Sequence, residues 1–290
     1  MRTGVDIAER SGRGGSLRQD IGIAAGNVRG RCESLPVTDR VLGRIGHLVV
    51  RLAASAEDVT AAQRLRHRVF VGQRDCDGLE CDRLDGFCDH LLAIDTRTDD
   101  VIGTYRLLTQ ERAEAHGGFY SDGEFEIDAL VRRQPHRKFL ELGRSCTLPD
   151  YRDRRTIELL WQGIWAYALR AGTDVMFGCA SFPGTNPAAH AAALGYLASN
   201  HMVPTEWGAG SRGGAALASF AEARFASARE ALRGLPPLVK GYLRLGGRVA
   251  PEFFVDHAFD CTDVLIVLPH EAISSRYLAH YGADASRFAA

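Results

Sequence analysis

The sequence predicts an α/β fold in which one mixed β-sheet carries helices on its faces. The first observation is the order of the expected elements, which runs strand, helix, several strands, helix, strand, helix, strand. The second is a strongly amphipathic segment, residues 156–170, which is long enough to form a helix covering a sheet. The third is the composition: 46% of the 290 residues are apolar and 24% are charged, which suffices for a sizeable core.

Ordered structure is expected to begin near residue 47. Residues 1–46 are rich in Gly, Arg and Ser and lack apolar periodicity, so we expect a flexible tail there. Residues 47–280 are predicted to form one domain with a C-terminal extension, and residues 281–290 a second tail. The sequence contains no internal repeat.

The first half of the domain is predicted to contain a strand, a helix and a hairpin. A short strand is expected over 47–52, and apolar residues at helical spacing predict a helix over 57–70. A polar, acidic loop follows. Two apolar runs, 90–95 and 101–108, then predict strands that form a hairpin through the acidic turn 95–100.

The middle of the domain is predicted to alternate strands and helices. A strand is expected over 139–148, followed by the amphipathic helix 156–170, which Gly172 should end. Residues 175–180 predict another strand. Residues 186–197 predict a helix with Pro187 in its first turn.

The C-terminal part combines a glycine-rich segment with further helices and strands. Residues 208–214 are expected to form a flexible connection, and the Ala-rich run 216–232 predicts a helix. A short helix is expected within 235–247, and strands are expected at 253–255 and 264–268. Lys240 and Arg244 in the short helix could form a surface that contacts a carrier protein or, peripherally, the inner membrane.

Charge, hydropathy and cysteine content exclude several classes of protein. The net charge of −1 gives no indication of nucleic-acid binding, and no apolar run approaches the roughly 20 residues that span a bilayer. Since the N-terminus also lacks an apolar signal-peptide core, we expect a cytoplasmic protein. The seven cysteines lack zinc-site spacing and are odd in number, so we expect free thiols and no metal.

The apolar strand FLELGRSCTL, residues 139–148, contains two charges that need an explanation. Burying Glu141 or Arg144 is costly unless each has a partner or a function. Residues three apart in a regular strand point to opposite faces, so a shared site requires a bulge, which Gly143 would tolerate. A bulge would also free backbone N–H groups to stabilise an oxyanion. The alternative is a structural ion pair.

Other charged residues occur on elements expected to be neighbours in the sheet. Arg66 and Phe70 lie four residues apart on one helix face, and Asp82, Asp85 and Asp89 occupy the following loop. Solvated helix positions and turn caps are the alternatives for these residues. Another charge, Arg106, lies in an apolar strand and therefore needs a carboxylate partner.

In this order and spacing the residues resemble two related families of the GNAT superfamily. Acyl-homoserine-lactone synthases carry R-x-x-x-F, D-x-x-D, a strand arginine and E-x-x-R, matched here by Arg66–Phe70, Asp82–Asp85, Arg106 and Glu141–Arg144. A closer resemblance is to the L-ornithine N-alpha-acyltransferase family, over about residues 47–280. It is carried by the blocks LRHRVF, FCDHLL, GTYRLL, GGFYSDGEFEI, ELGRSC, FGCASFPGT, LPPLVKGYLRLGG and DVLIVLP.

The resemblance implies a GNAT-like fold, with a mixed, mostly antiparallel central sheet flanked by helices. It also implies transfer of a 3-hydroxyacyl group from acyl-carrier protein to L-ornithine, the first step of ornithine lipid biosynthesis, with no tightly bound cofactor. One departure bears on the donor: the usual glycine-containing pyrophosphate loop is replaced by residues 151–156, YRDRRT. This favours a carrier protein over coenzyme A, with Arg152, Arg154 and Arg155 as contacts for phosphate or an acidic carrier surface.

The implied roles leave some choices open. Glu141 is the first candidate for the base that deprotonates the α-amine, and Asp85 is the second. The acceptor carboxylate is assigned to Arg106 or Arg144, the distal ammonium to Asp82 or Asp89, and other substrate contacts to Arg66 and Phe70. The oxyanion is assigned to N–H groups near Gly143, Ser145 and Cys146. The alternatives are a lactone synthase and a non-catalytic module that binds acyl chains or carrier protein; the former is disfavoured because the tryptophan usual in that family before D-x-x-D is missing.

Overall fold

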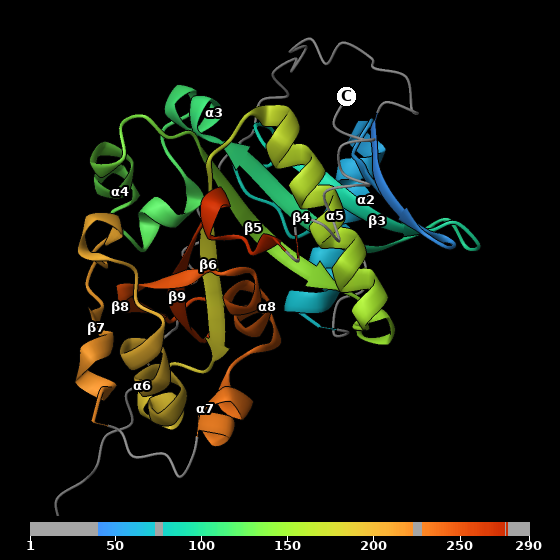
Figure 1. Cartoon of the computed structure of the whole chain (residues 1–290). Coiled ribbons are helices and arrows are strands. Elements are labelled where there is room, and N and C mark those ends of the chain that lie inside the picture. The colour runs from blue at the N-terminus through green and yellow to red at the C-terminus, as the bar shows by residue number, and fades with distance from the viewer. Residues whose placement is uncertain (1–39, 73–77, 223–227, 276, 278–290) are drawn as a thin grey trace, which may run out of the picture. The chain divides into compact units, whose positions relative to one another are not determined.

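A nine-stranded sheet in the order β1-β2-β3-β4-β5-β6-β9-β8-β7 organises the described part of the chain (Figure 1). The computed structural model describes residues 40–72, 78–222, 228–275 and 277. The strands are β1 Val41–Ile45, β2 Leu48–Leu52, β3 Asp89–Asp95, β4 Asp100–Thr109, β5 Phe139–Thr147, β6 Val175–Pro183, β7 Ala215–Ala216, β8 Arg248–Asp256 and β9 Cys261–Pro269. All neighbouring strands are antiparallel except β5 and β6, which confirms a mixed, mostly antiparallel sheet.

Helices cover both faces of this sheet. They are α2 Ala56–Phe70, α3 Gln110–Ala115, α4 Ile127–Arg133, α5 Arg154–Ala171, α6 Ala191–Asn200, α7 Ala228–Gly234 and α8 Pro237–Leu245. On one face, residues of α5 pack with Leu91 and Ala93 of β3, whereas Ala62 of α2 packs with Leu92 and Ile94 on the other. This alternation follows from the two-residue period of a strand.

Helix α5 forms because capping residues stand at both ends of its amphipathic segment. The side chain of Asp153 accepts a hydrogen bond from the Thr156 N–H, which caps the first turn. Gly172 ends the helix in the left-handed conformation with φ 61°. This helix is the crossover that allows β5 and β6 to run parallel.

The structure corrects three expected elements. Strand β1 lies inside the expected tail, because residues 41–45 pair with β2. The helix expected over 186–197 begins as a 3₁₀ turn, η3 Pro187–His190, before α6. The Ala-rich helix expected over 216–232 is wrong at its start, residues 216–220, whereas α7 confirms a helix over residues 228–232.

Tertiary packing explains this last correction. Residues 215–216 pair with β8, and η5, Leu217–Phe220, follows. Leu217 is buried, and the Phe220 ring packs 5.8 Å from that of Phe253. Packing against the sheet therefore outweighs the helical propensity of the alanines.

The other expected strands and helices are present in the structure. They are β2, α2, the hairpin β3–β4, β5, α5, β6, α8, β8 and β9. The segments 1–39 and 278–290, which include most of the expected tails, lie outside the described residues.

The strands β5 and β6 diverge in the middle of the sheet. Only residues 139–141 of β5 pair with residues 175–177 of β6. At the next position, a Cβ on Gly178 would lie 2.2 Å from the Leu142 carbonyl oxygen, so this close approach requires glycine. Beyond it β5 continues with β4 and β6 continues with β9.

A β-bulge in β5 lies at this divergence. Arg106 of β4 pairs with Gly143 and Thr104 pairs with Cys146, so two residues of β5 oppose one of β4. The expected bulge is therefore present, but the left-handed residue is Arg144, with φ 50°, and not Gly143. This conformation costs a non-glycine residue on the order of 1–2 kcal/mol.

Among the described helices, none is long and apolar enough to cross a membrane.

Candidate active site

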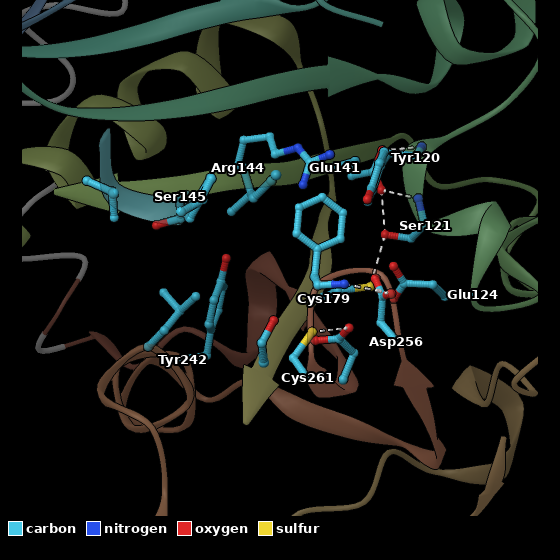
Figure 2. A pocket seen from close by; sticks show the side chains of 18 residues that line it. Tyr120, Ser121, Glu124, Glu141, Arg144, Ser145, Cys179, Tyr242, Asp256 and Cys261 are labelled. Atoms are coloured by element: carbon cyan, nitrogen blue, oxygen red, sulfur yellow. Dashed lines mark hydrogen bonds between the residues drawn. The ribbon is translucent and has the colours of Figure 1, made fainter. Parts of the chain in front are cut away.

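A cavity of about 410 Å³ opens where β5 and β6 diverge (Figure 2). Its walls come from α2, the turn after Phe119, β5, β6, α8 and the β8–β9 hairpin. They are lined by Val69, Phe70, Tyr120, Ser121, Glu124, Glu141, Leu142, Gly143, Arg144, Ser145, Cys179, Ser181, Leu238, Tyr242, Asp256, Phe259, Cys261 and Asp263. Glu141 and Arg144 both contribute, as the bulge argument requires.

Glu141 is fixed by the first turn of η1, Tyr120–Gly123. Its Oε1 accepts hydrogen bonds from the Ser121 N–H at 2.7 Å and the Ser121 hydroxyl at 2.5 Å, and its Oε2 from the Tyr120 N–H at 2.8 Å. Burial raises the pKa of this carboxyl, and the three donors offset only part of the rise. A carboxylate oxygen can accept two hydrogen bonds, so Oε2 keeps one acceptor position.

Arg144 is held between two aromatic rings and two carboxylates. Its guanidinium carbon lies 4.6 Å from the centre of the Tyr120 ring and 4.9 Å from that of Phe259. Its Nε lies 3.2 Å from Glu80 Oε1, and its Nη2 lies 3.5 Å from Asp82 Oδ2. These contacts fix a cation at the cavity wall.

A buried ion network continues from Arg144 away from the cavity. It consists of Arg66, Arg106, Arg144, Glu80, Asp82 and Asp85. Arg66 Nε lies 2.6 Å from Glu80 Oε2, and its Nη2 lies 2.7 Å from Asp85 Oδ2. Arg106 Nη1 lies 2.7 Å from Asp82 Oδ1 and 3.3 Å from Asp85 Oδ1. Three cations therefore balance three anions.

This network places several expected site residues behind the cavity wall. Arg66, Asp82, Asp85 and Arg106 do not line the cavity. Although burial opposes ionisation, the two arginines hold the pKa of Asp85 at about 2. Such a carboxylate is a poor base at neutral pH, so the geometry disfavours Asp85 for that role. These residues instead hold Arg144 in position. Glu80 does so too, although nothing in its local sequence distinguishes it from the other acidic loop residues.

The remaining expected residues lie in three different settings. Asp89 accepts from the Tyr167 hydroxyl at 2.7 Å and pairs with Arg112 at 2.9 Å, outside the cavity. Phe70, with 41% of its surface exposed, lies at the cavity mouth. Ser145 lines the cavity, whereas Cys146 is buried and does not line it. Burial raises the pKa of the Cys146 thiol to about 12.

The basic residues at the start of α5 are on the surface. Arg152, Arg154 and Arg155 are all exposed. Arg154 pairs with Glu158 at 2.9 Å. In α8, by contrast, Leu238 lines the cavity, and Tyr242 and Leu245 are buried. The apolar side chains that were expected to accompany Lys240 at a membrane surface therefore face inward.

Three carboxylates that the sequence reasoning missed also line the cavity. Glu124 follows η1, Asp256 ends β8, and Asp263 lies within β9. Burial and the negative charge of Asp263 raise the pKa of Glu124 to about 7. Burial likewise raises the pKa of Asp263. The sequence did contain a signal for Asp263, because it is the only charged residue in the apolar run CTDVLIVLP. A charge in an apolar strand is also what identified Glu141.

Comparison with known proteins identifies the fold of the region that carries Arg144. Residues 65–162 match the family model described as an acetyltransferase (GNAT) domain. Among solved structures, an N-acyl amino acid synthase from uncultured soil microbes, FeeM, is similar, with a TM-score of 0.46 and 11% identity over 77% of this chain and 91% of that one. The AHL synthase LasI has a TM-score of 0.45 and 13% identity, covering 81% and 95%.

Curated relatives extend the similarity over most of the sequence. The L-ornithine N(alpha)-acyltransferase of Rhizobium meliloti (strain 1021) is 50% identical over 270 residues, which cover 87% of this chain and 90% of that protein. A protein of the same name from Agrobacterium fabrum (strain C58 / ATCC 33970) is 45% identical over 89% of this chain and 92% of its own length. The chain therefore belongs to the L-ornithine N(alpha)-acyltransferase family and is an N-acyltransferase with the GNAT fold.

Proposed function

We propose that the protein transfers a 3-hydroxyacyl group from the phosphopantetheine thioester of acyl-carrier protein to the α-amine of L-ornithine. The product is a lyso-ornithine lipid, so this is the first step of ornithine lipid biosynthesis. The observation that carries the proposal is the charge distribution of the cavity at the β5–β6 divergence. Four carboxylates and one arginine line it, which suits a ligand with two amines and one carboxylate. The name of the relatives supports ornithine as that ligand.

Arg144 is assigned to the acceptor carboxylate. Among the described residues that line the cavity it is the only lysine or arginine, whereas Arg106 lies behind the wall. Its side chain is 12% exposed, so it reaches the cavity without being freely solvated. A planar guanidinium in this setting suits a carboxylate, and Tyr120 and Phe259 restrict its orientation.

Glu141 is assigned to the α-amine. This amine is mostly protonated at neutral pH and must lose a proton before it can attack a thioester. The remaining acceptor position on Oε2 and the raised pKa both suit a base. The neutral nitrogen then attacks the thioester carbon, and the C–S bond breaks as the nitrogen loses its second proton. Of the two protons that the ammonium releases, one reaches the departing thiolate by way of Glu141 and the other passes to solvent. No covalent enzyme intermediate is needed.

The donor is assigned to the gap between β5 and β6. Backbone N–H groups of residues 143–146 lie in the bulge beyond the last β5–β6 pair, where an oxyanion would form. The exposed rings of Phe70 and Phe259 at the mouth provide apolar contact for the acyl chain. The turn 151–156 contains no glycine, and its exposed arginines suit an acidic carrier surface better than a bound nucleotide.

An acylation assay tests the proposal. Purified protein is incubated with 3-hydroxyacyl carrier protein and a mixture of amino acids, and acylated products are identified by mass spectrometry. We expect acyl-ornithine, with a lower rate when the same acyl group is supplied on coenzyme A. Release of thiol and lactone only when S-adenosylmethionine is added would establish the lactone synthase alternative. No product under either condition would favour the non-catalytic module.

Replacing Gly143 by valine should impair donor use without unfolding the protein. Gly143 has no left-handed φ, and a Cβ at this position meets nothing within 4 Å. The valine side chain would therefore project into the cavity. We expect the KM for the acyl donor to rise at least about tenfold. Steady-state kinetics with a melting curve checks this, and Gly143→Ala serves as the smaller control; an unchanged KM would place the donor elsewhere.

A further inference from the structure

We propose that Glu124, Asp256 and Asp263 form a subsite that binds a second ammonium group on the acceptor, so that the enzyme selects amino acids with a cationic side chain. This inference rests on the proposed function and assigns its side-chain specificity to residues on three separate elements. It also replaces Asp82 and Asp89, the residues expected from the sequence, because both are paired with arginines outside the cavity.

The three carboxylates lie together in the cavity that Arg144 and Glu141 also line. Figure 2 shows Glu124 beside Asp256, with Cys179 between this group and Glu141. The negative charges of Asp263 and Asp256 both raise the pKa of Glu124, as expected for neighbouring carboxylates. A ligand bound to Arg144 and Glu141 through its α-carbon substituents can thus extend its side chain toward this group.

Two oxygens of the subsite are buried and accept no hydrogen bond from the part of the chain that the structure describes. They are Glu124 Oε2 and Asp263 Oδ1, on residues that are only 8% and 3% exposed. Leaving a buried acceptor without a donor is energetically unfavourable. Among the described residues that line the cavity, Arg144 is the only lysine or arginine, and it is paired with Glu80 and Asp82. The unpartnered oxygens are therefore acceptors that a bound cation can satisfy.

A primary ammonium suits this donor set better than a metal ion. Ligand atoms of Asp256, Cys261 and Asp263 lie within 4.8 Å of one another, so a divalent ion is the competing occupant. Cys261 Sγ, however, lies 3.2 Å from Asp263 Oδ2 as a thiol donor, whereas metals bind thiolates. The three carboxylates can instead each accept one of the three N–H bonds of an ammonium.

The discriminating experiment compares L-ornithine with L-norvaline, which has the same carbon chain but no side-chain amine. Values of kcat/KM are measured for both acceptors with the wild type, Glu124→Gln, Asp263→Asn and Asp128→Asn. The last is a matched control, because Asp128 is exposed and pairs with Arg132 away from the cavity. We expect the wild type to prefer ornithine. Glu124→Gln and Asp263→Asn should each reduce this preference about 10- to 100-fold, whereas the control should retain it.

Other outcomes overturn the inference in distinct ways. An equal loss for both acceptors would mean that the carboxylates only shape the cavity. A preference for ornithine that vanishes with EDTA and returns with Mg²⁺ or Mn²⁺ would assign the group to a metal. If neither acceptor is acylated, the proposed function fails, and calorimetric titration of ornithine and norvaline without donor still tests the subsite. Tighter binding of ornithine that Glu124→Gln abolishes would support it, and equal binding would reject it.

Discussion

Replacing Glu141 by glutamine should lower kcat by roughly 10²- to 10⁴-fold, because the variant cannot take a proton from the acceptor amine. Glutamine keeps the length of the side chain and one oxygen for the two Ser121 donors. Its amide would face the Tyr120 N–H, however, which costs about 1–3 kcal/mol of stability. Turnover should therefore be measured well below the melting temperature, with saturating donor and ornithine.

The matched control for this experiment is Ser121→Ala. It removes the hydroxyl donor to Glu141 Oε1 but leaves both backbone N–H donors and the carboxylate. We expect a smaller loss of kcat than for Glu141→Gln. If Glu141→Gln turns over at nearly the wild-type rate, Glu141 is not the base. If both variants lose activity equally and also melt early, the carboxylate is a structural support of η1.

Replacing Glu124 by glutamine should stabilise the free protein at high pH. The ordinary pKa of a glutamic acid is 4.5, and burial with nearby negative charge raises that of Glu124 to about 7. Between these values the unfolded chain loses the proton while the folded protein keeps it, so stability falls as pH rises. Above pH 7 the loss of folding stability caused by ionising Glu124 is complete, and it amounts to roughly 3 kcal/mol. Glutamine cannot ionise and avoids this cost.

Chemical denaturation at pH 5 and pH 8 measures the effect. Glu124→Gln should exceed the wild type in free energy of unfolding at pH 8, and the gap should shrink at pH 5. Asp128→Asn serves as control, since the Asp128 side chain is 55% exposed and should not reproduce the gap. Ornithine should stabilise the wild type more than the variant at pH 8. A gap that is the same at both pH values would show that Glu124 does not titrate in this range.

Local signals were sufficient for most of the fold. Asp153 and Gly172 mark the ends of α5, and the alternating and apolar runs give β3, β4, β5 and β9. The start of the run 216–232 was predicted wrongly because helix propensity is local, whereas the path of residues 215–220 is decided by pairing with β8 and by the burial of Leu217. Strand β1 was missed because five residues next to a Gly- and Arg-rich segment carry too weak a pattern.

The candidate site was predictable where a residue conflicts with the pattern of the residues around it. Glu141 and Arg144 are charges in an apolar strand, and this conflict identified them before any fold was known. Glu124 and Asp256 lie in or next to loops, where a carboxylate is unremarkable, and they meet only because the β8–β9 hairpin comes close to η1. The assignment of Asp82 and Asp85 to a buried network likewise depends on which arginines they meet in space.

The divergence of β5 and β6 also means that a nine-stranded sheet contains two edge-strand segments in its interior. An unpaired strand edge is a template for another chain, and proteins protect such edges with bulges and inward-pointing charges. Both devices are present here, since the bulge displaces the backbone at Arg144 and Glu141 places a charge beside it. The bulge and Glu141, which we propose serve the donor and the acceptor amine, thus also shield the centre of the sheet from pairing with another chain.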